Sequence, residues 1–350
     1  MLVGVAKGKL YRWYKDILSG FSEPDTQENL HHYDIRTKEI DHRTQQEQII
    51  RVPILKPENL EAEMAIDEKY IGGEFYTILS NRINGKIALM AGTLKSEQLC
   101  GLLSHFHEKL FTVKHITRDL SGSYDWVCRQ MFMNAAHTAD KFHILTHLFD
   151  ALQSVRIYHR QKILTMQREA LEAFKKQEKE QKDLFKKQNV QYISKEFKKK
   201  EQRLENGETM RELLARSQYL LYKYPDQWSF TQLNRAELLF GHFPDIHQAY
   251  KLCISFRNWY QKDNIHKPIE DIRSELQRWY KSVEEYSIEE LLNFKSLVER
   301  HEGIILNYFL FGKTNANAES LNAKIQRFIQ SNKGARDRDF TFFRLKNFFS

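Results

Sequence analysis

Between residues 62 and 140 the hydrophobic positions form short apolar runs separated by turn signals. Gly72-Gly73 and Asn84-Gly85 have the composition of tight turns between strands. The pattern predicts strands at 64–67, 75–80 and 87–90, a helix at 96–109, a strand at 113–119, a helix at 124–132 and a strand at 135–140. This β-β-β-α-β-α-β order is that of an RNase H-like sheet, so we expect an α/β fold built on a mixed sheet.

From Phe142 onward the apolar positions recur with the period of a helix. One long helix or helical hairpin is predicted from Phe142 to about Lys200. Further helices are predicted at 208–221, 230–240, 246–260, 268–286 and 288–307. The sequence therefore predicts an all-helical region, residues 156–311, which interrupts an α/β core formed by residues 62–155 and 312–350.

Residues 1–61 form a polar, His-rich lead-in. A short helix is predicted from Lys9 to Leu18. The stretch from Ser22 to Gln48 is charged and has few apolar residues, so we expect a loop or a segment that orders on a partner or on DNA.

Composition narrows the class of protein. The 350 residues carry a net charge of +8, with a pI of about 9.1, and a basic chain attracts polyanions such as nucleic acid. The three cysteines are far apart and form no CxxC pair, which argues against a disulfide framework or a zinc ribbon. The longest apolar run, Ile304 to Phe311, is too short to span a bilayer. We therefore expect a soluble cytoplasmic protein without a membrane partner.

The positive charge is concentrated in two regions. Residues 156–203 hold 15 Lys/Arg against 7 Asp/Glu, a net of +8, and this region is either a solvated helix face or a contact with the DNA backbone. Residues 312–350 hold 8 Lys/Arg against 3 Asp/Glu, a net of +5. Their cations include Lys333, Arg336, Arg338 and Arg344, interspersed with Phe residues. This region either binds phosphate beside an active site or docks on the core as an amphipathic helix.

Three carboxylates are candidates for chemistry. Asp67 and Asp119 are each predicted to end a strand, and Glu319 opens a predicted helix. Divalent cations need oxygen ligands held on rigid elements, and two such ions can stabilise an in-line phosphoryl displacement. The helical period places Asn322 on the face of Glu319, with Leu321, Ile325 and Phe328 opposite. The alternative is that Glu319 only interacts with the helix dipole.

Several blocks of the sequence resemble the insertion-sequence transposases of the third ISL family, in the family's order. They are Ile66-Asp67-Glu68 with Glu74-Phe75-Tyr76-Thr77, then Thr117-Arg118-Asp119-Leu120, then Asn134-Ala135 through Asp140-Lys141-Phe142-His143, and finally Thr314 through Ile325. Residues 213–217 with 219–221, and 244–246 with 249–250, are similar to the Aon-type subgroup. The similarity covers about residues 55–350.

The resemblance implies a DDE transposase with an RNase H-like core and an all-α insertion. It carries Asp67, Asp119 and Glu319 over as ligands of two Mg²⁺ ions, for which Mn²⁺ substitutes. Asp140 and His143 would form an accessory DxxH element, and Asn322 would orient Glu319. The alternative for His143 is a structural histidine. The implied partners are double-stranded DNA at transposon ends and target, and further copies of the chain in a homodimer or larger synaptic complex. The implied location is the bacterial nucleoid.

The sequence also departs from the family pattern. Met133 stands where the family often has Pro, and the chain has neither a Cys-rich zinc element nor a recognisable helix-turn-helix near its start. Two explanations stay open: a separate small DNA-binding protein recognises the transposon ends, as the subgroup resemblance implies, or the gene is truncated. Trp228, in a predicted loop, is a candidate for stacking on a flipped base, with core packing as the alternative. A structure-selective nuclease and a DNA-binding relic without activity stay open as alternative functions.

Overall fold

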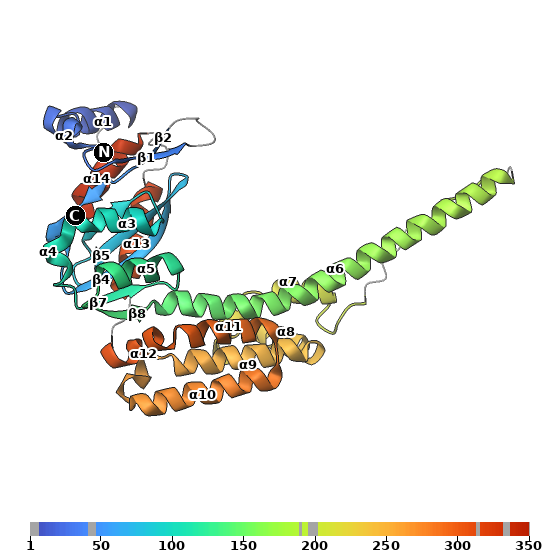
Figure 1. Ribbon diagram of the computed structural model, residues 1–350. Coiled ribbons are helices and arrows are strands. Elements are labelled where there is room, and N and C mark those ends of the chain that lie inside the picture. Colours follow the sequence, from blue (N-terminus) through green and yellow to red (C-terminus); the bar gives the residue numbers. More distant parts are fainter. Residues whose placement is uncertain are drawn as a thin grey trace. The chain divides into compact units, whose positions relative to one another are not determined.

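The computed structural model describes residues 7–40, 47–188, 191–194, 202–312, 316–331 and 337–349. The chain divides into two compact units, which we call unit 1 (Met1–Ile144 with His301–Ser350) and unit 2 (Leu145–Arg300). The sequence analysis placed the corresponding boundaries at 155/156 and 311/312, each eleven residues further along the chain. Figure 1 labels the elements of the two units.

Unit 1 contains a mixed six-stranded sheet with the strand order β3-β6-β5-β4-β7-β8. The strands are β3 (Ile54–Leu55), β4 (Glu63–Ile71), β5 (Glu74–Asn81), β6 (Ile87–Ala91), β7 (His115–Arg118) and β8 (Ala136–Ala139). The neighbours β3, β6, β5 and β4 pair antiparallel in that order, whereas β7 and β8 run parallel to β4. Gly72, Gly73 and Gly85 adopt left-handed φ values of 59°, 96° and 72°, as the two predicted turns require.

Helices cover both faces of this sheet. On one face lie α3 (Ser96–Leu103), α4 (His107–Leu110) and α5 (Gly122–Met131), whose residues Leu99 and Val127 pack on Ile66. The predicted single helix at 96–109 is divided by a 3-10 turn, Ser104–Phe106. On the other face α13 (Ala316–Ser331) and α14 (Arg338–Phe349) bury Ile325 and Leu345 against the sheet. The mixed α/β class predicted from the sequence is confirmed.

The N-terminal region is more ordered than the sequence indicated. Helix α1 (Lys7–Trp13) continues into a π-helical segment (Tyr14–Leu18). The short helix predicted from Lys9 to Leu18 is therefore confirmed. The prediction of a loop between Ser22 and Gln48 was wrong, because α2 (Pro24–Asn29), β1 (Ile35–Ile40) and part of β2 (Glu47–Ile50) lie there. β1 and β2 pair antiparallel in a separate small sheet.

This N-terminal region is held by α14, some 300 residues later in the chain. The Phe21 ring is buried, with its centroid 5.1 Å from that of Phe340. Ion pairs join Lys15 to Asp337 and Arg51 to Asp339. The local sequence gave no sign of this order because the apolar and charged partners lie at the other end of the chain.

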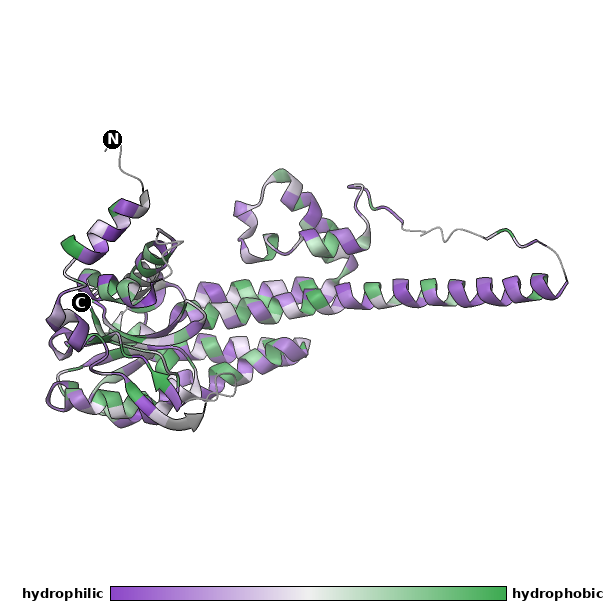
Figure 2. Ribbon diagram, turned by 90° about the horizontal axis from the view of Figure 1, so that it is seen from above, coloured by the Kyte–Doolittle hydropathy of each residue, from purple (hydrophilic) through white to green (hydrophobic). Residues whose placement is uncertain are grey.

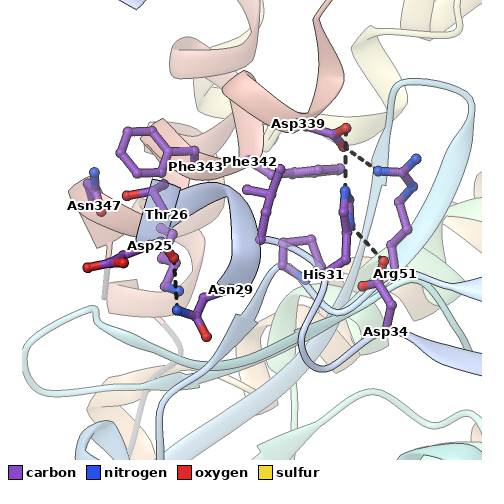
Figure 3. Close-up of a pocket in the computed structure, with 13 residues that line it drawn as sticks. Asp25, Thr26, Asn29, His31, Asp34, Arg51, Asp339, Phe342, Phe343 and Asn347 are labelled. Carbon is purple, nitrogen blue, oxygen red and sulfur yellow. Dashed lines mark hydrogen bonds and ion pairs between the residues drawn. The ribbon is translucent and has the colours of Figure 1, made fainter. Parts of the chain in front are cut away.

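Figure 3 shows the hollow that remains between α2, the following loop and α14. The ring of His31 stands at its wall, with Nδ1 2.9 Å from Asp34 Oδ2 and Nε2 3.6 Å from Asp339 Oδ2. Asp339 also pairs with Arg51. These charged contacts fasten the N-terminal region to α14 and account for the polar side chains around the hollow.

Unit 2 is helical in its described residues, apart from an isolated bridge between Arg203 and Thr209. Its helices are most of α6 (Lys141–Lys187), then α7 (Met210–Arg216), α8 (Phe230–His242), α9 (Pro244–Trp259), α10 (Ile269–Tyr286) and α11 (Glu289–Arg300). Short 3-10 turns lie at Leu220–Tyr222, Pro225–Gln227 and Lys262–His266, and in unit 1 at Pro57–Asn59. The predicted helix at 288–307 is divided at His301, and its second part, α12 (Glu302–Phe311), belongs to unit 1.

Local signals and core packing explain the helices of unit 2. Capping boxes, in which the side chains and backbones of two residues cap each other, start α7 at Thr209 and α8 at Ser229. The core between α9, α10 and α11 is aromatic, with the Phe256 ring 4.8 Å from Trp279 and 5.2 Å from Phe294. None of the described helices is long and apolar enough to cross a membrane.

Candidate active site

Strand register aligns three aspartates. Ala65 of β4 lies opposite Thr117 of β7, an offset of 52 residues, and Arg118 lies opposite Ala139 of β8, an offset of 21. Continuing these offsets by one or two residues places Asp67, Asp119 and Asp140 at one level across three neighbouring parallel segments. Asp119 and Asp140 directly follow β7 and β8.

Asp67 occupies a different place in its strand from the one predicted. β4 continues to Ile71 because β5 pairs with it as far as Ile71 opposite Glu74, so Asp67 lies within the strand and not at its end. Alternate residues of a strand point to opposite faces, and Ile66 points to the α3–α5 face. Asp67 therefore points to the face that α13 and α14 cover.

Backbone groups fix all three carboxylates. Asp67 Oδ1 accepts from the N–H of Glu68 at 2.8 Å, and Asp119 Oδ1 accepts from the N–H of Ser121 at 2.9 Å. Asp140 Oδ1 accepts from the N–H of Phe142 at 2.9 Å, which makes it the N-cap of α6. The carboxylates are thus oriented by rigid elements before any ligand arrives.

His143 lies in the first turn of α6, beside two of these carboxylates. Its Nε2 is 3.5 Å from Asp67 Oδ1 and 3.9 Å from Asp140 Oδ2. The hydrogen bond to Asp67 raises the pKa of His143 to about 9, against the effect of burial, and the charges of Asp140, Asp67 and Asp119 add to the rise. A protonated imidazole therefore offsets part of the negative charge of the cluster.

The charges of Asp67 and Asp119 also act on Glu68, which lies on the opposite face of β4. Partial loss of hydration raises the pKa of its carboxyl, and the charges of Asp119 and Asp67 raise it further. The sequence analysis did not include Glu68 in the site. Only the strand register, which brings residues 68 and 119 together, reveals it.

The third predicted carboxylate, Glu319, lies in the first turn of α13, which contacts β4. The predicted packing of this helix is confirmed for Leu321 and Ile325, which are 3% and 0% exposed. The side chains of Glu319 and Asn322 lie outside the described residues. Among the side chains that the structure describes, no group of three or more His, Cys, Asp or Glu is arranged to hold a metal ion.

A network beneath the aspartates ties β5 and β7 to α5. Tyr124 of α5 is buried, and its hydroxyl lies 3.1 Å from that of Thr77, which donates to the carbonyl of Thr93 at 2.6 Å. Arg118, 1% exposed, donates to the carbonyl of Asp119 at 3.0 Å and pairs with Asp125. The sequence analysis did not identify Tyr124 and Arg118 as residues that support the site. For Arg118, the reason is that a charged residue in a short strand gives no signal of burial.

Comparison with known proteins shows the family to which the chain belongs. A transposase family model, that of the third ISL family, matches residues 64–346. This chain is a member of that transposase family. No curated protein and no solved structure matches it significantly.

The C-terminal cations predicted to bind DNA make internal contacts in this transposase. Arg338 donates to Glu74 Oε1 at 2.9 Å, and the Arg344 guanidinium lies 5.0 Å from the centre of the Phe328 ring. Both residues help to hold α14 in place. Lys333 and Arg336 lie outside the described residues. Contact of these four residues with DNA stays a prediction.

Trp228 packs within unit 2 of the transposase. Its Nε1 donates to the carbonyl of Leu220 at 2.9 Å, and its ring centre is 5.6 Å from that of Tyr250 and 6.1 Å from that of Phe240. These contacts match the core-packing alternative that the sequence analysis left open. Stacking of Trp228 on a flipped base stays a prediction.

Proposed function

We propose that this transposase cleaves DNA strands at transposon ends and joins the freed 3′-OH to target DNA, using an RNase H-like core. The observation that carries the proposal is the row of Asp67, Asp119 and Asp140 at one level of three parallel segments. The strand order, with an antiparallel β4–β5–β6 meander followed by parallel β7 and β8, supports the RNase H-like assignment. Unit 2 would then be an all-α insertion between β8 and α12.

The donor set fits a hard divalent cation such as Mg²⁺ or Mn²⁺, since these ions prefer oxygen ligands. Asp67 and Asp119 supply carboxylates on neighbouring parallel segments, and Glu319 would supply a third from α13, which packs on the face toward which Asp67 points. Two ions held by these residues would stabilise the attacking and the leaving oxygen of an in-line displacement. The same site would serve both the cleavage and the joining step.

The remaining residues of the site would position these ligands. Asp140 caps α6 and so fixes the first turn, from which His143 reaches Asp67. A protonated His143 holds one oxygen of Asp67 and reduces the repulsion among the three aspartates. On α13, Asn322 would orient Glu319 in the same way, as a neighbouring group on one helix face.

The reaction also implies partners. Two transposon ends must be held together, so a homodimer or larger synaptic complex on double-stranded DNA is expected. A separate small DNA-binding protein would recognise the ends, as the resemblance to the Aon-type subgroup implies.

The experiment combines a strand-nicking assay and a joining assay on DNA that carries the ends of the element, with Mg²⁺ or Mn²⁺. Asp119→Asn, which keeps the size of the side chain, is compared with Glu97→Gln. Glu97 is an exposed carboxylate on α3, which lies on the other face of the sheet from α13. We expect wild type and Glu97→Gln to nick and join, and Asp119→Asn to do neither. Nicking without any joined product would favour a structure-selective nuclease, and binding without nicking would favour a DNA-binding relic.

A further inference from the structure

The distal part of α6 does not pack into the core of unit 2. Val155 and Arg156 are buried, but no residue from Ile157 to the end of the helix at Lys187 is. Figures 1 and 2 show this part continuing beyond the helices that follow it, with hydrophilic residues predominating. Most of the stability of helices in proteins comes from the packing of an apolar face, so the surface of this unpacked part calls for an explanation.

One sector of this part carries positive charge alone. At about 100° of rotation per residue, five cations fall within a sector of about 60° and no acidic residue of the distal part falls in it. They are Arg168, Lys175, Lys179, Lys182 and Lys186, and we call them the basic stripe. The sector on one side of the stripe carries both signs, namely Glu169, Glu172, Glu180 and Asp183 with Lys162, Lys176 and Lys187, and Glu178 lies on the other side. Positive charge is therefore continuous only along the stripe.

Tyr192, which follows the end of α6, contacts another side of the helix from the basic stripe. The Tyr192 ring centre is 5.4 Å from that of Phe185, and its hydroxyl donates to Gln181 Oε1 at 3.4 Å, on the apolar side of the helix. All five cations are exposed. Within the described part of the chain, no ion pair involves any of the five.

We propose that the basic stripe binds the backbone of double-stranded DNA without regard to sequence. The inference rests on the proposed function, which makes duplex DNA the substrate. From residue 168 to residue 186 the helix rises about 27 Å, at about 1.5 Å per residue. That length matches about eight base pairs, at about 3.4 Å each, so the row of cations is long enough to reach several phosphates along one side of a duplex. The stripe extends the DNA surface beyond the carboxylate site.

The test compares two triple variants that remove the same charge from the same helix. Lys175→Gln, Lys179→Gln and Lys182→Gln neutralise the stripe, whereas Lys162→Gln, Lys176→Gln and Lys187→Gln neutralise exposed lysines outside it. Gln and Lys have similar helix propensities, so the helix itself is preserved. Binding of the full chain to a random-sequence duplex is measured by fluorescence anisotropy over a range of salt concentrations, in EDTA so that no cleavage takes place.

We expect the stripe variant to lower the slope of log affinity against log salt by about 2.7, which is about 0.9 for each lost phosphate contact. Affinity at about 0.1 M salt should fall roughly tenfold or more, whereas the control variant should change the slope by less than about 1. Equal slopes for both variants would overturn the proposal, as would wild type that binds no duplex. If the stripe variant changes only the sedimentation of the chain and not its DNA binding, the proposal is overturned in favour of self-association through the stripe. Because binding is measured without cleavage, equal slopes or an effect on sedimentation alone would overturn the stripe and leave the transposase reaction unaffected, whereas wild type that binds no duplex would count against both.

Discussion

The carboxylates that we propose for chemistry in unit 1 are few and close together, whereas the cations that we propose for DNA binding in unit 2 are spread along one exposed helix. In unit 1, strand register aligns Asp67, Asp119 and Asp140, and each carboxylate accepts a backbone N–H. In unit 2, the basic stripe is exposed and follows one face of α6.

The difference follows from what each surface has to do. Like charges held a few ångströms apart repel each other, so they persist only on a rigid frame and with compensating charge, here from His143. Cations that contact a polyanion need reach and exposure, and their effect adds up from many weak, salt-sensitive contacts. Single substitutions should therefore be severe in unit 1 and mild in unit 2.

The largest expected effect is that of Glu319→Gln in unit 1. If α13 supplies the third carboxylate, removal of its charge should reduce nicking by at least about 1,000-fold, as loss of a group essential to transition-state stabilisation does. Gel-based nicking assays would measure the rate. A loss of less than about tenfold would show that Glu319 is outside the site and only interacts with the dipole of its helix.

The packing of α13 gives the next effect. Ile325 is 0% exposed, so Ile325→Ala should lower the free energy of unfolding by about 2–5 kcal/mol, through lost burial and a cavity. Denaturant unfolding would measure it. Lys324→Ala, at an exposed site of the same helix, should change it by less than about 0.5 kcal/mol. Similar values for both variants would show that α13 is not anchored on the sheet.

His143→Gln should lower the nicking rate about 10- to 100-fold, because Asp67 would lose the group that orients it. The fold should be retained, which circular dichroism would show. His242→Gln, at an exposed site of unit 2, is the matched control and should leave the rate unchanged. An unchanged rate in His143→Gln would establish that this histidine is structural only.

The smallest effect concerns an ion cluster inside unit 2. Hydrogen bonds from Arg235 and Arg216 lower the pKa of Glu208, whose side chain is 6% exposed. A lowered pKa in the folded state stabilises the fold above the ordinary value of 4.5, and this stabilisation is lost as the pH falls below it. Glu208→Gln should therefore cost about 1–2 kcal/mol at pH 7 and nothing once wild-type Glu208 is protonated. Urea unfolding at a series of pH values would measure the difference, and a constant cost at every pH would contradict it.

The sequence predicted the central sheet well because its signals are local. The turns at Gly72-Gly73 and Gly85 and the short apolar runs between them locate β4, β5 and β6 within a few residues. It also placed Asp119 at the end of its strand, within one residue of where β7 ends. It could not place Asp67 within β4, because the length of a strand depends on where its partner β5 ends.

Other features depend on contacts that the local sequence does not contain. The order of the N-terminal region comes from α14, through Phe21 with Phe340 and Arg51 with Asp339. The alignment of Asp140 with the other two aspartates needs the register of β7 and β8. The internal pairing of Arg338 with Glu74 joins residues 264 positions apart, so the sequence alone could not show this contact.

The most direct test of the active site replaces Mg²⁺ with Fe²⁺ and adds ascorbate and peroxide, so that radicals cut the backbone near the bound iron. We predict cuts around residues 67, 119, 140 and 319, which Mg²⁺ suppresses and which Asp119→Asn abolishes. Mass spectrometry of the fragments would map the cuts. Cuts around the aspartates without any near residue 319, or a pattern unchanged in Asp119→Asn, would contradict a single site built from β4, β7 and α13.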